Sequence, residues 1–226
     1  MQLTEVSIFG LRSVVLVFKH RDSPLRFVLM PVVHMGRPDY YRLLSERLAR
    51  CQLIVAEMYD GPSSTGLAYV TALRLTRQYR GGPLVHQNID YEALGVPTVW
   101  PDGRILEGRR RRLPLAGWID LALLVPYLTI TMAVGGRDML MRQNFEISDI
   151  SEPRMRWALM NRLMLEERDR DLVATVQRIH TERRHEQIDV AVIYGAAHLP
   201  AVVRALAGGL GYRPQRGGEW LLAIDF

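Results

Sequence analysis

The chain has 226 residues, of which 48% are hydrophobic and 23% charged, so it can bury the core of a globular domain. Its single cysteine, Cys51, excludes an internal disulfide and a cysteine-based zinc site. The formal net charge is +5, mostly from arginine, but the only dense run, 109–112, lacks an accompanying nucleic-acid-binding motif, so we expect no nucleic-acid partner. The N-terminal sequence lacks the basic-then-apolar layout of a secretion signal, which predicts a cytoplasmic protein.

The first part of the chain predicts strands and helices in alternation. Residues 3–20 and 25–34 predict two strands around a turn at 21–24. Proline suits the first turn of a helix, so Pro38 predicts a helix start. The elements expected after that helix are a short buried strand over 52–57, a helix over 66–79, a short strand over 84–87 and a helix turn over 90–94.

The middle of the chain has a polar stretch at 97–108, which predicts a hairpin, and then a long apolar run over 113–134. The length of the run and the flanking arginines are typical of a transmembrane helix. Against that interpretation, Asp120 and Pro126 lie inside the run, and a charge near the centre of a span costs about 2.5–3.5 kcal/mol. We therefore expect one or two buried or interfacial helices, ended by Gly135–Gly136.

The last part of the chain again alternates helices and strands. The expected elements are a long helix from Glu152 to about residue 184, a strand over 189–195, a helix over 199–207 stopped by glycines at 208–211, and a last strand over 220–224. This order predicts an α/β fold with a mixed central sheet, parallel strand pairs and flanking helices. We expect a single domain over residues 1–226, with a helical insertion or lobe over 100–185.

Three polar residues, His34, Glu57 and His198, each end an apolar, strand-like run. Ligands bind at the carboxyl ends of parallel strands, so these side chains are expected to meet. Two imidazoles and a carboxylate can ligate a divalent metal, and burial of Glu57 requires compensation by a metal or an arginine. Alternatively, each histidine is a core or capping residue. Arg168 either forms an ion pair on a helix surface or turns inward to hold Glu57 or an oxyanion.

Further histidines and polar residues have both functional and structural interpretations. His86, Gln87 and Asp90 follow a short apolar run. They either line the same site, with His86 as a further ligand, or start a loop in which Asp90 caps a helix turn. His180 and His185 lie near the basic end of the long helix and are expected to be solvated helix-end residues.

Four segments resemble signatures of the TraB/TIKI family and occur in the family's order. Two of them are similar to the family's two Gly-x-x-His signatures: Val32–Gly36, which Pro38 and Tyr40 follow, and Ile193–Pro200. Val55–Glu57 matches the family's glutamate at the end of a strand, and Leu165–Asp169 is similar to a Glu-Arg-Asn helix motif. The chain departs from the family at Pro31, where the first motif has glycine, and at Asp169, where the helix motif has asparagine. Residues 97–150 match nothing in the family.

This resemblance implies the fold shared by erythromycin esterases and haem-binding ChaN-like proteins. It also implies a divalent-metal hydrolase, with manganese or cobalt as the metal rather than zinc. By position, His34, Glu57 and His198 would be the metal-site and catalytic residues, and Arg168 would supply electrostatic support. Family membership does not by itself fix the reaction.

Four functions remain open from the sequence. The first is metal-dependent cleavage of an amide or ester bond in a small molecule or peptide, and the second is metal-independent His/Glu general-base chemistry on an ester, lactone or cyclic intermediate. The third is haem binding, and the fourth is contact of residues 109–134 with a partner or with an anionic membrane surface. Phosphate-binding glycine loops and serine nucleophile elbows are absent from the sequence, which disfavours nucleotide-dependent and serine-hydrolase chemistry. The sequence indicates no oligomeric state.

Overall fold

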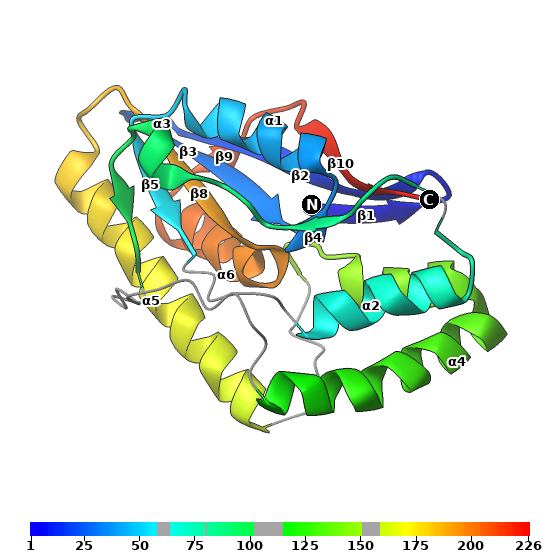
Figure 1. The fold of residues 1–226 in the computed structure, drawn as a ribbon. Coiled ribbons are helices and arrows are strands. Elements are labelled where there is room, and N and C mark those ends of the chain that lie inside the picture. The colour runs from blue at the N-terminus through cyan, green and yellow to red at the C-terminus, as the bar shows by residue number, and fades with distance from the viewer. Residues whose placement is uncertain (58–63, 80, 102–114, 151–158) are drawn as a thin grey trace.

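The computed structural model describes residues 1–57, 64–79, 81–101, 115–150 and 159–226 (Figure 1). Its main sheet has the order β1-β2-β3-β8-β5-β7, with β9 and β10 also paired to β2. The strands are β1 (Thr4–Ser7), β2 (Gly10–His20), β3 (Ser23–Val32), β5 (Leu53–Ala56), β7 (Thr98–Val99), β8 (Asp189–Gly195), β9 (Arg213–Pro214) and β10 (Glu219–Asp225). A small second sheet pairs β4 (Met35–Gly36) with β6 (Val85–His86).

The main sheet is mixed, as the alternation of strands and helices predicts. β2 pairs antiparallel with β1, β3, β9 and β10, whereas β3, β8, β5 and β7 are parallel neighbours. The general α/β class is therefore confirmed. The parallel strands have apolar runs because both of their faces are covered, as in other parallel sheets.

Helices cover both faces of this sheet (Figure 1). They are α1 (Pro38–Leu48), α2 (Ser64–Leu75), α3 (Tyr91–Leu94), α4 (Leu115–Phe145), α5 (Leu159–Arg183) and α6 (Leu199–Arg204), with a 3-10 turn over Ala196–His198 and a π turn over Ala205–Gly209. Alternate residues of β3 enter two separate cores. Met30 packs in the core that contains Leu44 of α1, whereas Leu29 packs with Leu172 of α5 and Val202 of α6. The expected insertion over 100–185 contains α4 and α5, and its status as a separate lobe stays a prediction.

The single strand expected over residues 3–20 is wrong, because the chain reverses direction at residues 8 and 9. β1 and β2 form a hairpin in which Ser7 pairs with Gly10. Gly10 has a φ of 147°, and a Cβ there would lie 2.0 Å from the carbonyl oxygen of Ile224. Only glycine allows this close approach of the last strand, and its apolar neighbours conceal the turn from a reading of hydrophobicity alone.

The helix expected over residues 113–134 is longer than its apolar run. Gly136 adopts a non-helical conformation (φ 75°, ψ 159°), so a first helical segment ends at the expected Gly135–Gly136 stop, and a second segment, which was not predicted, continues α4 to Phe145. Among the described residues, no helix has the length and apolar character needed to cross a membrane. The short strands β7 and β9 were not expected, and the hairpin expected at 97–108 and the helix start at Glu152 lie wholly or partly outside the described residues.

Candidate functional site

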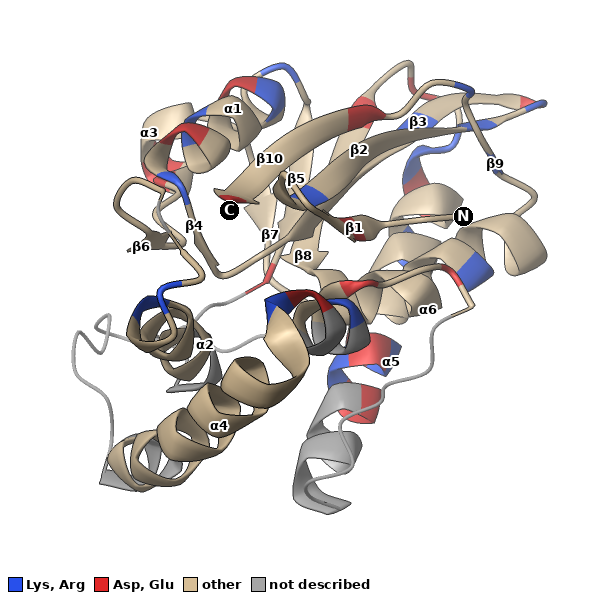
Figure 2. Cartoon of the chain, turned by 90° about the vertical axis from the view of Figure 1, so that its right-hand side faces the viewer, with Lys and Arg blue, Asp and Glu red and all other residues tan. Residues whose placement is uncertain are grey.

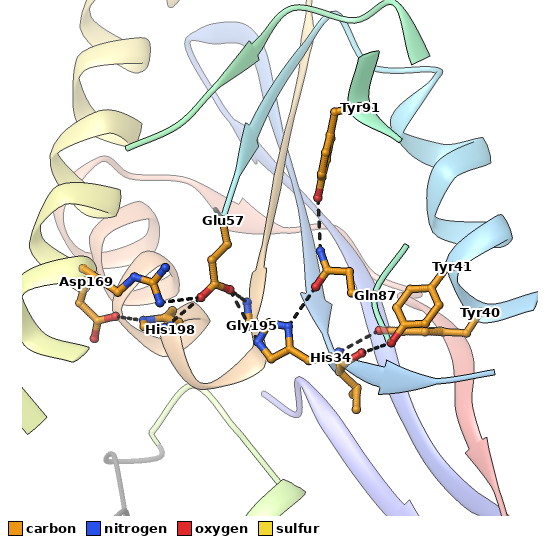
Figure 3. Close-up of polar contacts among 11 residues, drawn as sticks. His34, Tyr40, Tyr41, Glu57, Gln87, Tyr91, Asp169, Gly195 and His198 are labelled. Carbon is orange, nitrogen blue, oxygen red and sulfur yellow. Dashed lines mark hydrogen bonds and ion pairs between the residues drawn. The ribbon is translucent and has the colours of Figure 1, made fainter. Parts of the chain in front are cut away.

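The carboxyl ends of β3, β8 and β5 bring the three strand-end residues to one edge of the sheet (Figure 3). Val32 pairs with Gly195, and Ala56 pairs with Ile193, so the three strands end at nearly the same level. The backbone N–H group of Glu57 donates to the carbonyl of Ile193 at 3.1 Å and continues the parallel ladder by one residue. The expected meeting of His34, Glu57 and His198 is therefore what the structure shows.

Glu57 is 5% exposed, and both oxygens of its carboxylate have close partners. Oε2 accepts a hydrogen bond from the backbone N–H group of Gly195 at 2.6 Å. Oε1 lies 3.1 Å from Nη1 of Arg168, which reaches the sheet from α5. A buried carboxylate is costly unless it is paired and hydrogen-bonded, and here an arginine supplies the compensating charge. The inward interpretation of Arg168 thus agrees with the structure.

His198 is buried and is held on both sides. Its Nδ1 lies 2.6 Å from Oδ1 of Asp169, and its Nε2 lies 3.6 Å from Oε1 of Glu57. Because a carboxylate can only accept a hydrogen bond, Nδ1 carries the ring proton and donates a hydrogen bond to Asp169. In the neutral ring, the lone pair is then on Nε2, which faces Glu57. The ring of Tyr194 packs edge-on against the imidazole, with centroids 5.7 Å apart.

The imidazole of His34 is oriented like that of His198, but the partner of its Nδ1 is a neutral amide. Its Nδ1 is 2.9 Å from the amide oxygen of Gln87, and its Nε2 is 3.9 Å from Oε2 of Glu57. Gln87 is itself fixed, because its backbone N–H group donates to the carbonyl of His34 and its side-chain amide donates to the hydroxyl of Tyr91. Burial raises the pKa of Tyr91 well above its ordinary value, so its hydroxyl stays protonated. Both imidazoles therefore direct Nε2 toward the one carboxylate.

Gly195 makes room for this convergence. A Cβ at this position would lie 2.9 Å from Nε2 of His34 and 3.1 Å from Oε2 of Glu57. The first distance is shorter than real contacts allow, so an alanine would displace one of the two side chains. This is a steric reason for the glycine in the segment Gly195-x-x-His198.

Pro31, the departure in the first motif, lies in β3 without disturbing the sheet. The pairing of β3 with β2 reaches only as far as Leu29, so the missing N–H group of Pro31 leaves no gap in that ladder. The carbonyl of Pro31 accepts a hydrogen bond from the hydroxyl of Tyr40 at 3.1 Å, and Tyr41 donates to the carbonyl of Val33 at 2.7 Å. Burial raises the pKa of Tyr40 to about 12, which keeps this donor protonated.

The other candidate residues have mixed outcomes. Asp90 accepts a hydrogen bond from the N–H group of Ala93 at the start of α3, so its interpretation as a cap is confirmed. His86 lies opposite Met35 between β4 and β6, and its pKa is lowered first by burial and then by the charge of His34. His180 is at the far end of α5, where its Nδ1 lies 3.0 Å from the hydroxyl of Tyr212; it is partly buried rather than fully solvated, whereas the nearby residue 185 is exposed.

Two contacts at the site were not foreseen in the sequence. In the sequence Asp169 is only a departure from a helix motif, yet in the structure it is the partner of His198. The sequence makes Gln87 a candidate for the site, but it does not predict that Gln87 is the partner of His34. The available signal was position: Asp169 directly follows Arg168, and Gln87 directly follows a short strand.

The donor types suit a divalent metal, but their arrangement in this structure does not. Among the residues that the structure describes, no three His, Cys, Asp or Glu side chains are grouped to hold an ion. Both oxygens of Glu57 are instead engaged by Arg168 and by the amide of Gly195. A metal bound by this carboxylate would have to displace or rearrange these contacts.

Comparisons of the chain with family models, with curated proteins and with solved structures found no match. The fold is α/β with a mixed sheet, and the resemblance to the TraB/TIKI family rests on the four sequence segments.

Proposed function

We propose that the chain is a hydrolase whose active site comprises His34, Glu57, Arg168 and His198, with Asp169 as a positioning residue. One observation carries this proposal. A buried carboxylate, balanced by an arginine, lies between two imidazoles whose outer nitrogens are each held by a hydrogen-bond acceptor. A purely structural network has no need to direct two imidazole nitrogens toward one point, whereas acid–base catalysis does.

The geometry best supports a metal-independent reaction on an ester, a lactone or a cyclic intermediate. Asp169 holds the tautomer of His198 that leaves Nε2 ready to accept a proton from water. The oxygen of that water attacks the carbonyl carbon, and the guanidinium of Arg168, which has five N–H donors, stabilises the oxyanion that forms. His34, in its protonated form, gives a proton to the leaving oxygen as the C–O bond breaks. Glu57 keeps the arginine and both imidazoles in place.

A metal-dependent hydrolase of the TraB/TIKI type, within the erythromycin esterase/ChaN-like fold, is the second candidate. It is favoured by the acceptors on Nδ1 of both histidines, since metal-ligating histidines usually donate their other ring nitrogen to a carboxylate or carbonyl. In this form His34, Glu57 and His198 would hold manganese or cobalt, and the ion would lower the pKa of a bound water and polarise an amide or ester carbonyl. Glu57 would first have to give up its present contacts.

Hydrolysis of a panel of esters, lactones and short peptides, before and after exhaustive chelation, tests both candidates. Activity that survives chelation and is lost in His198→Ala and His34→Ala supports the metal-independent reaction. Activity that is lost on chelation and restored by manganese or cobalt, with about one metal per chain by elemental analysis, selects the metal-dependent form. His185→Ala is a matched control, because this exposed histidine lies at the opposite end of the sheet.

If His34→Ala and His198→Ala fold normally and keep full activity on every substrate that the unmodified chain hydrolyses, the proposed site is wrong. Circular dichroism and thermal unfolding of each variant separate loss of the site from loss of the fold.

A further inference from the structure

The outer face of α4 is apolar and exposed along most of the helix. Its large exposed side chains are 52% to 85% accessible to solvent. From Ile119 onward they recur at intervals of three or four residues and form one stripe, and Trp118 adjoins its first member: Trp118, Ile119, Leu123, Tyr127, Ile130 and Val134. No residue from 121 to 136 is charged, and in Figure 2 most of the described length of α4 has the colour of residues that are neither acidic nor basic.

This stripe is not needed to hold α4 on the protein. The opposite side of the helix, which includes Leu128 and Met132, is buried in the core beside α2. Scattered apolar residues on a surface are ordinary, but a continuous apolar stripe on a helix that is already anchored by its other face indicates an interaction surface. The stripe runs over about 24 Å from residue 118 to residue 134, at 1.5 Å per residue.

The charges in and around α4 indicate which partner this surface fits. The sequence from 104 to 145 contains seven arginines and three acidic residues, and four of the arginines are consecutive at 109–112. In the described structure, Arg74 of α2 and Arg142 of α4 are exposed on the same helix pair. Basic residues beside an apolar helix face that includes Trp and Tyr are the combination that binds anionic lipid surfaces. A second copy of the chain would instead bring the same excess of arginine to the interface, where like charges repel.

We propose that the apolar stripe of α4 binds the surface of an anionic membrane, with the helix lying along the interface and exposed arginines of the described helix pair contacting the lipid headgroups. This proposal is independent of the hydrolase reaction. It assigns a role to the apolar character of α4 on both of its sides, because one side fills the core and the other enters the lipid interface.

Flotation of the full chain with vesicles tests the proposal, with phosphatidylcholine alone compared with phosphatidylcholine plus phosphatidylglycerol. We expect binding to the anionic vesicles that falls about tenfold or more in the double variant Leu123→Glu/Ile130→Glu. The double variant Ile8→Glu/Phe9→Glu is the matched control, since these residues are 64% and 75% exposed at the β1–β2 turn and are not part of the stripe, and it should bind as the unmodified chain does. The double variant Arg74→Ser/Arg142→Ser should weaken binding to anionic vesicles and reduce its dependence on salt.

Fluorescence locates the contact directly. Brominated lipids should quench the fluorescence of Trp118, and the quenching should be lost in Trp118→Phe but not in Trp220→Phe. Absence of binding to anionic vesicles, or equal binding by the Leu123→Glu/Ile130→Glu variant, overturns the proposal. A concentration-dependent dimer that is lost in that variant, without vesicle binding by the unmodified chain, assigns the stripe to a second copy instead.

Discussion

Asp169 and His198 form a carboxylate–imidazole pair, with Oδ1 and Nδ1 2.6 Å apart and the imidazole buried. The pair joins α5 to the turn after β8, so one hydrogen bond fixes both a ring tautomer and a contact between a helix and the sheet edge. The other histidine of the site has a neutral amide in the same role.

Asp169 is the first test of this arrangement. Asp169→Ala should lower kcat by about 10²–10⁴-fold, because the tautomer of His198 is no longer held. Asp169→Asn should lose a similar amount, because the amide NH2 group can donate to Nδ1 and so place the ring proton on Nε2. Equal activity and identical pH profiles in all three proteins would rule out a positioning role.

Arg168 should matter for stability as well as for activity. Arg168→Met leaves the buried carboxylate of Glu57 without its compensating charge. We expect the free energy of unfolding to fall by about 2–3 kcal/mol, which is less than for a fully buried pair because the arginine side chain is 33% exposed. Urea unfolding measures this. Adding Glu57→Gln should recover part of the loss, and Arg170→Met, an exposed neighbour on α5, should change stability by less than about 0.5 kcal/mol.

Gly195→Ala tests the steric argument at the site. The added methyl group would displace His34 or Glu57, so we expect kcat/KM to fall by about 10²-fold while the protein remains folded. Gly208→Ala is the matched control, because a Cβ there meets nothing within 4 Å. Steady-state kinetics with both variants distinguishes a packing effect at the site from a general effect of replacing glycine. Full activity in Gly195→Ala would mean that His34 and Glu57 need not approach each other.

His180 should make stability depend on pH, far from the site. Its pKa in the folded protein is lowered by burial and then by the charges of His20 and Arg184. The unfolded chain therefore binds this proton more readily than the folded chain, and stability falls as pH decreases from the ordinary histidine value of about 6.5 toward the lower folded value. In His180→Gln this part of the decrease should disappear from urea unfolding measured between pH 7.5 and 5. The exposed His185→Gln should keep it.

The sequence predicts that the residues at the strand ends meet, but it does not predict which residues on helices join them. The β-branched runs before His34, Glu57 and His198 indicate buried strands, and parallel strands place their ends at one edge. Arg168 and Asp169 lie in a charged helical stretch where a surface ion pair is the ordinary expectation. Which way such a helix turns depends on the packing of Leu172 and Val176 against the sheet. That packing is a tertiary property, and the local pattern of charges does not reveal it.

The predicted limits of helices and strands differ from the structure for a related reason. Gly136 ends the first helical segment of α4 as predicted, but a second segment follows, because later residues such as Met141 return to the core. Gly10 lies in an apolar stretch that predicts a continuous strand, yet it marks a hairpin that is stabilised by β10 from the far end of the chain. In both cases a contact with a distant residue outweighs the local preference.

Arg168 and Asp169 are consecutive residues on α5, and their side chains serve two different groups of the site. The charge compensation of Glu57 and the orientation of His198 therefore both depend on the position of α5. A shift of α5 by about 1 Å along the sheet edge would stretch both contacts together, and such a misplacement can cost a hundredfold in rate. We therefore expect both contacts, and the activity that depends on them, to be lost together when α5 moves.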